Sequence, residues 1–154
     1  MHLEQFKNKH AGETCAILGG GVSLPNDLRE MGEVDRLIGV NQHAAILDLD
    51  YLVFLDTHVF PLVQDIKNVM LITKKKKHQA ANLIHAGIAP PIGYSGLLAI
   101  WIADYLGFDK ITVCGMDQYD TRKDQREYWW EGPQCQQMQR HKLCKSDIML
   151  LKKY

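Results

Sequence analysis

The stretch TCAILGGGVSLPNDL, residues 14–28, decides the fold. Its first part, Thr14–Leu18, is a short apolar run of the kind that forms a buried parallel strand. Three glycines then turn the chain into an amphipathic segment, Ser23–Met31, in which Ser23 suits the N-cap and Pro25 the first turn. Gly32 is placed to end that helix. The stretch therefore predicts a strand–loop–helix unit.

The same alternation of apolar runs and amphipathic segments continues along the chain, which favours βαβ units and a parallel sheet. The further strands that we predict are Arg36–Val40, Tyr51–Leu55, Val69–Thr73 and Ile111–Gly115, and the further helices are His58–Ile66, Gly93–Leu106 and Gln136–Tyr154. We predict an α/β fold: a Rossmann-like three-layer sandwich with a parallel sheet of about five strands, in the order 3-2-1-4-5. Residues 1–154 are expected to form one domain.

Composition argues against several classes of protein. Lys and Arg together number 18, as do Asp and Glu, so the formal net charge is zero, whereas nucleic-acid binders usually carry a basic excess. No apolar run reaches the roughly 18 residues of a membrane helix, and the polar N-terminus lacks the apolar core of a signal peptide. We expect a cytoplasmic protein with no membrane span and reduced cysteines. Cys135, His141 and Cys144 do not have the spacing of a common zinc site, so no metal is expected.

The glycine loop, Gly19 to Gly21, raises the question of a bound phosphate. It leads into a predicted helix, whose free N–H groups and positive dipole end attract anions. It is not a Walker A loop, because no Gly-Lys-Ser/Thr follows. The dinucleotide fingerprint is only partly matched, because Leu24 stands at its third glycine and Asn41 replaces the acidic residue after the next strand. A tight turn without a ligand remains the alternative.

Other polar residues end predicted strands or begin predicted helices at the same carboxyl edge of the sheet, where open parallel sheets bind their ligands. Together with the glycine loop, the candidate binding residues are Gly19, Gly20, Gly21, Ser23, Asn41, Gln42, Asp56, Ser95, Gly96 and Asp117. Individually, each of them also has a structural explanation as a cap, a turn residue or a solvated side chain. The charge run Lys74–His78 follows a predicted strand and is expected at this edge too.

Four of these segments resemble a known superfamily. The loop Gly19–Leu24, the strand-end Asn41, the pair Ser95-Gly96 at a helix start and the motif GMDQY at 115–119 are similar to elements of bacterial sialyltransferase-like glycosyltransferases. Archaeal-type 6-hydroxymethylpterin diphosphokinase-like domains carry them too. The resemblance covers about Cys15 to Tyr119.

What this resemblance implies is a nucleotide-binding transferase that uses a CMP-activated sugar. Gly19 to Ser23 would approach the nucleotide phosphate, and Asn41 the phosphate or ribose. Ser95 and Gly96 would line the base or ribose, and Tyr119 would hydrogen-bond the leaving phosphate. Residues 120–141 would form a lid that ends in a catalytic base, His141. No cofactor is then required, the partner is a nucleotide or nucleotide-sugar, and the acceptor is open. A chain this small often completes its site in a homo-oligomer.

Two alternatives stay open. The first is a diphosphokinase that transfers diphosphate from ATP to a pterin-like alcohol, with Mg²⁺ held by Asp56 and Asp117 and with Lys74–Lys77 screening the triphosphate. The second is a nucleotide-binding or interaction module without catalysis, which the short chain favours.

Overall fold

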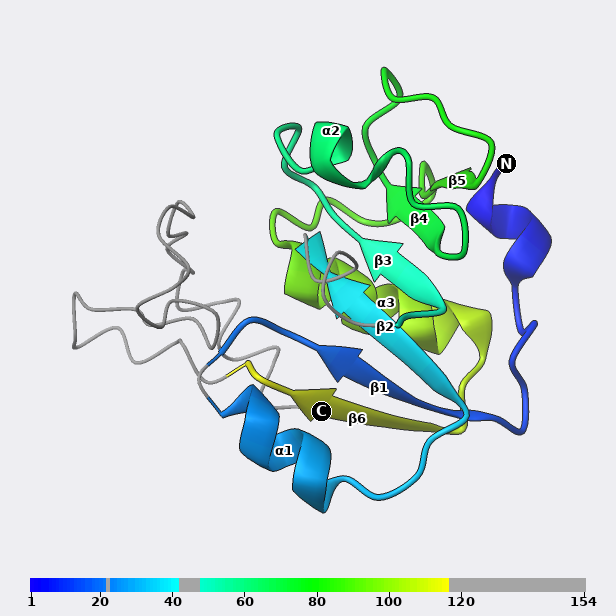
Figure 1. Ribbon diagram of the computed structural model, residues 1–154. Helices are drawn as coiled ribbons and strands as arrows, with labels where there is room; N and C mark the ends of the chain where they lie inside the picture. The colour runs from blue at the N-terminus through cyan, green and yellow to red at the C-terminus, as the bar shows by residue number, and fades with distance from the viewer. Residues whose placement is uncertain (22, 42–47, 117–154) are drawn as a thin grey trace, which may run out of the picture.

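Six parallel strands form a single sheet in a computed structural model that describes residues 1–21, 23–41 and 48–116 (Figure 1). Their order across the sheet is β5-β4-β3-β2-β1-β6. The strands are β1 (Thr14–Leu18), β2 (Arg36–Val40), β3 (Tyr51–Val53), β4 (Met70–Thr73), β5 (Leu83–His85) and β6 (Lys110–Cys114). The predicted α/β class is confirmed, with one strand more than the five that the sequence suggested.

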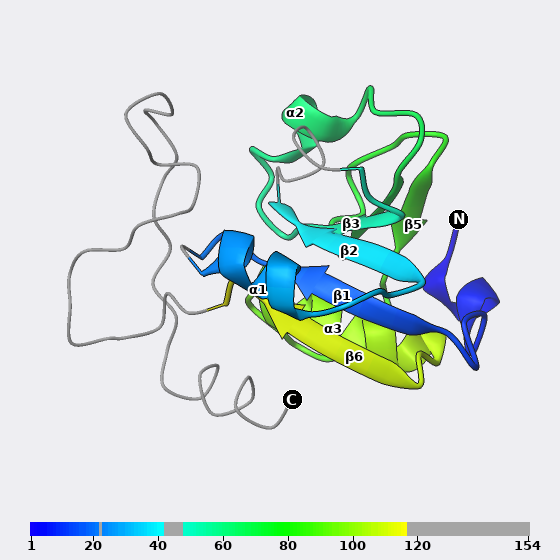
Figure 2. The same ribbon diagram turned by 60° about the horizontal axis from the view of Figure 1, so that its bottom comes forward.

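Helices cover both faces of this sheet. They are the short 3-10 helix η1 (Leu3–Phe6) and the α-helices α1 (Leu24–Glu30), α2 (Phe60–Val63) and α3 (Ser95–Leu106). Figures 1 and 2 show α1 on one face of β1 and β6 and α3 on the other. Residues of β1 alternate between two apolar clusters: Cys15 and Ile17 join the α3 side, and Ala16 and Leu18 join the α1 side. The molecule is therefore a three-layer sandwich.

The predicted strand order was wrong in the placement of Val69–Thr73. That strand, observed as β4, pairs with β3 through Val53↔Ile72 and does not lie beside β1. The free side of β1 pairs with β6, in register Leu18↔Cys114. The connection between β3 and β4 holds only the four-residue α2, so the chain steps to the adjacent position. The connection that contains α3 therefore crosses the whole sheet, from β5 at one side to β6 at the other. This distance is five strand spacings of about 4.8 Å each.

Local predictions hold best where a glycine or an apolar run marks the boundary. Strands β1 and β2 have the predicted bounds, and Gly32 and Gly107 follow α1 and α3 with positive φ angles of 73° and 86°. The predicted helix at His58–Ile66 is only the short α2, and β5 was missed because three residues are too few to show a period. The predicted helix at Gln136–Tyr154 lies outside the described residues.

Because all six strands are parallel, their carboxyl ends lie along one edge of the sheet, hereafter the carboxyl edge. The glycine loop after β1, Asn41 after β2 and the lysine run after β4 all begin there. The opposite border, where the strands begin, is called the amino edge. Within the described residues, no helix has the length and apolar character that a membrane crossing requires.

Candidate functional site

The structure brings the described candidate residues to the carboxyl edge. Gly19, Gly20, Gly21 and Ser23 lie between β1 and α1, Asn41 follows β2, Asp56 lies between β3 and α2, and Ser95 and Gly96 begin α3. A hydrogen bond joins the end of β3 to the start of α3, and the side chain of Met116 contacts both the glycine loop and α3. The remaining candidates, Gln42, Asp117, Tyr119 and His141, lie outside the residues that the structure describes.

The glycine loop is packed tightly against the end of β6. The backbone N–H of Gly19 donates to the carbonyl of Cys114 at 2.8 Å, and that of Gly21 donates to the carbonyl of Gly115 at 2.6 Å. A Cβ on Gly19 would clash with the carbonyl oxygen of Gly115, whose own φ is +64°. Glycine is therefore needed at both places to let two backbones meet. The same contacts occupy two of the amides that could otherwise hold a phosphate.

A carboxylate already lies beside this loop. Ser23 occupies the N-cap position of α1, but its hydroxyl donates to the carboxylate of Asp27 at 2.7 Å instead of capping the helix. The same oxygen of Asp27 accepts the backbone N–H of Gly115 at 2.7 Å. Asp27 thus supplies a negative charge where α1 would favour an anion, and this charge repels a phosphate. Sequence reasoning missed Asp27, because the contact joins positions 88 residues apart.

Asn41 combines two unusual features. Its backbone is left-handed, with φ of +63°, a conformation that costs a residue with a side chain roughly 1 kcal/mol. Its side-chain oxygen Oδ1 is buried and has no hydrogen-bond partner among the described residues. A buried acceptor without a partner costs about 1–3 kcal/mol. Backbone strain and an unpartnered buried acceptor together make Asn41 a candidate for contact with a ligand.

The start of α3 offers hydrogen-bond donors. Ser95 is 7% exposed, and its hydroxyl oxygen accepts the backbone N–H of Leu55 at 3.0 Å, which ties the end of β3 to the helix. The N-cap residue Tyr94 makes no side-chain cap, so the first-turn amides of Gly96 and Leu97 have no partner in the described part of the chain. A helix start of this kind attracts anions.

Met116 joins the glycine loop to α3. A Cβ on Gly96 would lie 3.0 Å from the Cε of Met116, and a Cβ on Gly19 would lie 2.8 Å from its sulfur. The side chain of Met116 therefore packs between these two glycines, beyond the end of β6. Sequence analysis did not single out this methionine. Its place in the GMDQY motif, directly after a strand and a glycine, is the only signal that could have found it.

Neither buried cysteine, Cys15 near the start of β1 or Cys114 at the end of β6, is suited to act as a nucleophile. Burial raises the pKa of the Cys15 thiol to about 12, and burial together with Asp27 raises the pKa of Cys114 to about 11. Both thiols are therefore protonated at neutral pH. Among the described residues, no group of three His, Cys, Asp or Glu side chains is placed to hold a metal ion.

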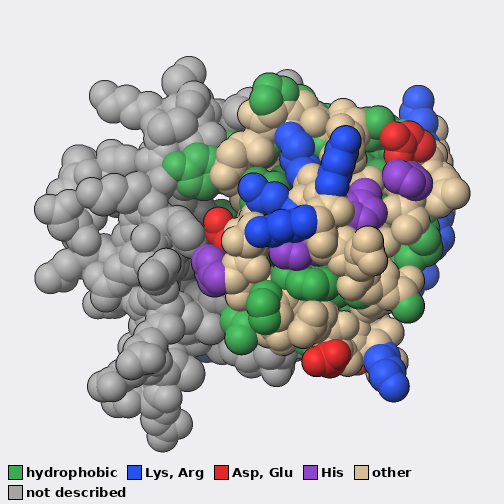
Figure 3. Space-filling model, turned by 90° about the horizontal axis from the view of Figure 1, so that it is seen from above, with side chains coloured by type: hydrophobic (Ala, Val, Ile, Leu, Met, Phe, Trp, Pro, Cys, Tyr) green, Lys and Arg blue, Asp and Glu red, His purple; other side chains and the backbone are tan. Residues whose placement is uncertain are grey.

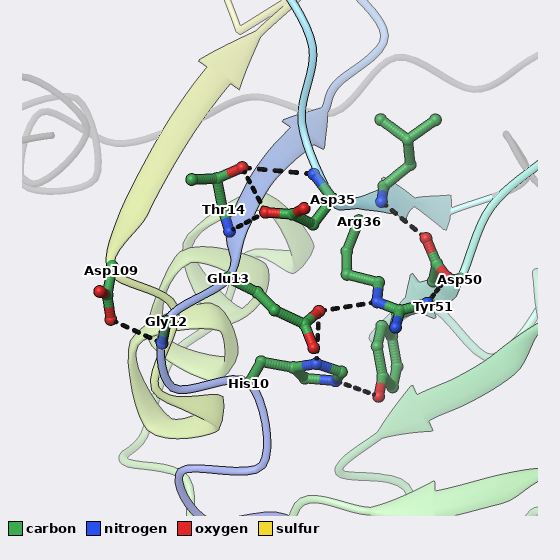
Figure 4. Close-up of polar contacts among 10 residues, drawn as sticks. His10, Gly12, Glu13, Thr14, Asp35, Arg36, Asp50, Tyr51 and Asp109 are labelled. Carbon is green, nitrogen blue, oxygen red and sulfur yellow. Dashed lines mark hydrogen bonds and ion pairs between the residues drawn. The ribbon is translucent and has the colours of Figure 1, made fainter.

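A second polar cluster lies at the amino edge (Figure 4). The imidazole of His10, 4% exposed, has Nε2 at 2.6 Å from the hydroxyl of Tyr51 and Nδ1 at 3.1 Å from the carboxylate of Glu13. Arg36 binds Glu13 at 2.8 Å and Asp50 at 3.0 Å. The hydrogen bond from Arg36 holds the pKa of Glu13 below its usual range. This cluster is internally satisfied, so we assign it to stability.

In comparisons with known proteins, no family model matches this chain, and no curated protein or solved structure is significantly similar to it. The class that the fold defines is an all-parallel α/β sandwich. The buried side-chain atoms that lack a hydrogen-bond partner in its described part lie at the carboxyl edge. The function is therefore argued from the residues of that edge.

Proposed function

We propose that this chain is a nucleotide-binding transferase whose ligand lies along the carboxyl edge between Asn41 and the start of α3. The observation that carries the proposal is the buried Oδ1 of Asn41, an acceptor without a partner among the described residues, on a left-handed backbone. An acceptor of this kind needs an O–H or N–H donor. A ribose hydroxyl or the amino group of a base supplies one, whereas an ionised phosphate oxygen does not.

The phosphate of such a ligand is best held by α3. The amides of Gly96 and Leu97 have no partner among the described residues, and the hydroxyl of Ser95, whose oxygen accepts from Leu55, also carries a hydrogen that it can donate. The positive end of a helix dipole adds attraction for the anion. The amides of Gly19 and Gly21 already donate to the carbonyls of Cys114 and Gly115, so the glycine loop would contribute only a close approach of its backbone to the ligand.

The reaction that we propose is glycosyl transfer from a CMP-activated sugar. Charge develops on the departing phosphate, and donors that are fixed before the reaction stabilise it most. The α3 amides meet this requirement. The resemblance implies that Tyr119 adds a donor and that His141 removes the proton of the acceptor hydroxyl, since an imidazole has an ordinary pKa near ~6.5. Both residues lie outside the described part of the chain.

Thermal shift with CMP, CTP, ATP and GTP, each with and without Mg²⁺, tests the proposal. Stabilisation by CMP that does not need the metal supports glycosyl transfer, because bound ligand stabilises the folded state by mass action. Stabilisation by ATP only with Mg²⁺ supports the diphosphokinase, for which Asp56 at the same edge would be a metal ligand. No shift with any nucleotide contradicts nucleotide binding altogether.

His141 separates binding from turnover. Replacing His141 by Ala is expected to keep the affinity for CMP and to abolish transfer, because a general base acts on the acceptor and not on the donor nucleotide. Isothermal titration gives the affinity and product formation gives the turnover. Full turnover in this variant would remove His141 from the catalytic role.

A further inference from the structure

A run of lysines forms a turn at the carboxyl edge, directly after β4. Lys75, Lys76 and Lys77 are exposed, and Lys74 is partly exposed. Figure 3 shows Lys and Arg side chains gathered next to histidines near the middle of one face of the molecule. We call Lys74 to Lys77 together with His78 the lysine turn.

The lysine turn is fixed to the fold at both of its ends. The backbone N–H of Lys75 donates to the hydroxyl of Thr73 at 3.3 Å, and that of His78 donates to the carbonyl of Lys75 at 3.3 Å. The ammonium of Lys74 donates to the carbonyl of Pro90. The ring of His78, 7% exposed, stacks on Phe60 with the ring centroids 4.2 Å apart. The three exposed lysines therefore project from an anchored turn.

Among the described residues, no acidic side chain pairs with the three exposed lysines of this turn. The ion pairs found among those residues involve Arg36 or His10 at the amino edge, and none involves Lys75, Lys76 or Lys77. Burial lowers the pKa of His78, and the cations of Lys77 and Lys75 lower it further. Adjacent like charges repel one another, and a multivalent anion between them relieves that repulsion. Nε2 of His78 is also buried without a partner in the described part.

The position of the turn relates it to the proposed nucleotide site. Strand β4 is separated from β2, which ends at Asn41, by β3 alone. Two strand spacings amount to about 10 Å along the edge. A second substrate that lies on the lysine turn would therefore reach towards the nucleotide. The zero net charge of the chain argues that the turn serves a small anion and not a nucleic acid.

We propose that the lysine turn binds a di- or triphosphate group of the acceptor substrate, with Lys75, Lys76 and Lys77 as its ligands. The acceptor class rests on the proposed transferase function, whereas binding of the anion by the turn does not. Exposed ammonium groups bind phosphate mainly as point charges, so the affinity falls with ionic strength.

Titration with inorganic triphosphate, pyrophosphate and phosphate tests the proposal. We expect the affinity to rise with the charge of the anion, and the variant with Lys75→Gln, Lys76→Gln and Lys77→Gln to lose at least about tenfold in affinity for triphosphate. The matched control carries Lys7→Gln, Lys67→Gln and Lys110→Gln, three exposed lysines elsewhere. It changes the net charge equally and is expected to bind as the wild type does.

The imidazole of His78 reports binding at the turn itself. Triphosphate that neutralises Lys75 and Lys77 raises the pKa of His78 towards its ordinary value, which an NMR titration of the ring protons follows. Equal loss of affinity in the two triple variants would overturn the proposal, as would no binding of triphosphate. Preference for a short single-stranded RNA, or for phosphatidic acid vesicles over soluble triphosphate, would overturn it too. CMP binding that persists in these cases leaves the nucleotide site standing.

Discussion

The two edges of the sheet differ in whether their buried polar groups have hydrogen-bond partners. At the amino edge, His10 is buried and yet both of its ring nitrogens have partners, Glu13 and Tyr51. At the carboxyl edge lie all three of the buried side-chain atoms that lack a partner in the described residues: Asn41 Oδ1, His78 Nε2 and His85 Nδ1. Buried polar groups are normally satisfied. The difference assigns the amino edge to the stability of the fold and supports the proposal that the carboxyl edge holds the ligand.

The backbone N–H groups at the starts of strands and helices differ between the two edges in the same way. At the amino edge the N–H of Thr14 donates to Asp35 at 2.7 Å, and the N–H of Leu37 donates to Asp50 at 2.9 Å, so strand starts are capped by carboxylates. At the carboxyl edge the N-cap residue of α3, Tyr94, makes no side-chain cap, and the first amides of the helix have no partner in the part of the chain that is described. The glycine loop is the exception, because the amides of Gly19 and Gly21 donate to the carbonyls of Cys114 and Gly115.

The largest expected effect is on stability, at the amino edge. His10→Ala removes the ring that stacks on Phe108 at 4.6 Å and leaves the hydroxyl of Tyr51 buried without its partner. We expect the free energy of unfolding to fall by about 2–4 kcal/mol, from the cavity and the unsatisfied hydroxyl together. Urea unfolding measures it. The affinity of the folded fraction for nucleotide should not change. A loss of affinity would contradict the assignment of the amino edge to stability alone.

Substitutions of two asparagines distinguish the effect of backbone strain on stability from the effect of the side chain on ligand binding. Asn41 and Asn8 both have positive φ, 63° and 55°, at opposite edges of the sheet. Replacing either by Gly relieves a left-handed backbone and is expected to keep or raise the stability, by up to about 1 kcal/mol. Only Asn41→Gly removes the proposed ligand acceptor, so only this variant should weaken CMP binding, by about tenfold. Calorimetric titration of both variants checks this, and equal affinities would remove Asn41 from the site.

Acid should destabilise the two edges in different pH windows. The pKa values of His78 and His85 are lowered in the fold, so the unfolded chain takes up protons first and stability falls as the pH drops below about 6.5. The pKa values of Glu13 and Asp35 are also lowered, so their contribution is present above the ordinary carboxyl values and is lost as the pH falls through the folded ones.

Two substitutions resolve these windows. His78→Gln is expected to flatten the curve of stability against pH between neutrality and pH ~5, and Glu13→Gln is expected to flatten it only at lower pH. Unfolding midpoints in urea, measured across this range, provide the comparison. Identical profiles for the two variants would contradict the assignment of the groups to their windows.

The smallest expected effect concerns Asp27. Asp27→Asn removes the negative charge beside the glycine loop and keeps an oxygen that accepts the N–H of Gly115. We expect the affinity for a phosphorylated nucleotide to rise by about two- to threefold, from a change of roughly 0.5 kcal/mol near a helix start. Competition binding against the wild type at low salt measures it, and weaker binding would assign Asp27 a direct contact with the ligand.

Sequence reasoning reached the parts of this molecule that local pattern encodes. The strand Thr14–Leu18 could be predicted from its apolar run, and the end of α3 could be predicted from Gly107. Asn41 could be chosen as a candidate because it follows a predicted strand. The strand order and the contact of Asp27 with Gly115 could not be predicted from the sequence. Both depend on which distant segments meet, and binary pattern does not encode that.

The central claim is that a nucleotide binds along the carboxyl edge between Asn41 and the start of α3. Backbone amide NMR of the uniformly labelled chain, titrated with CMP, tests it most directly. The account predicts shifts concentrated at Asn41, Ser95 and Gly96, with the amide of Glu13 at the amino edge unmoved. Shifts centred on the amino edge, or none at saturating CMP, would contradict it.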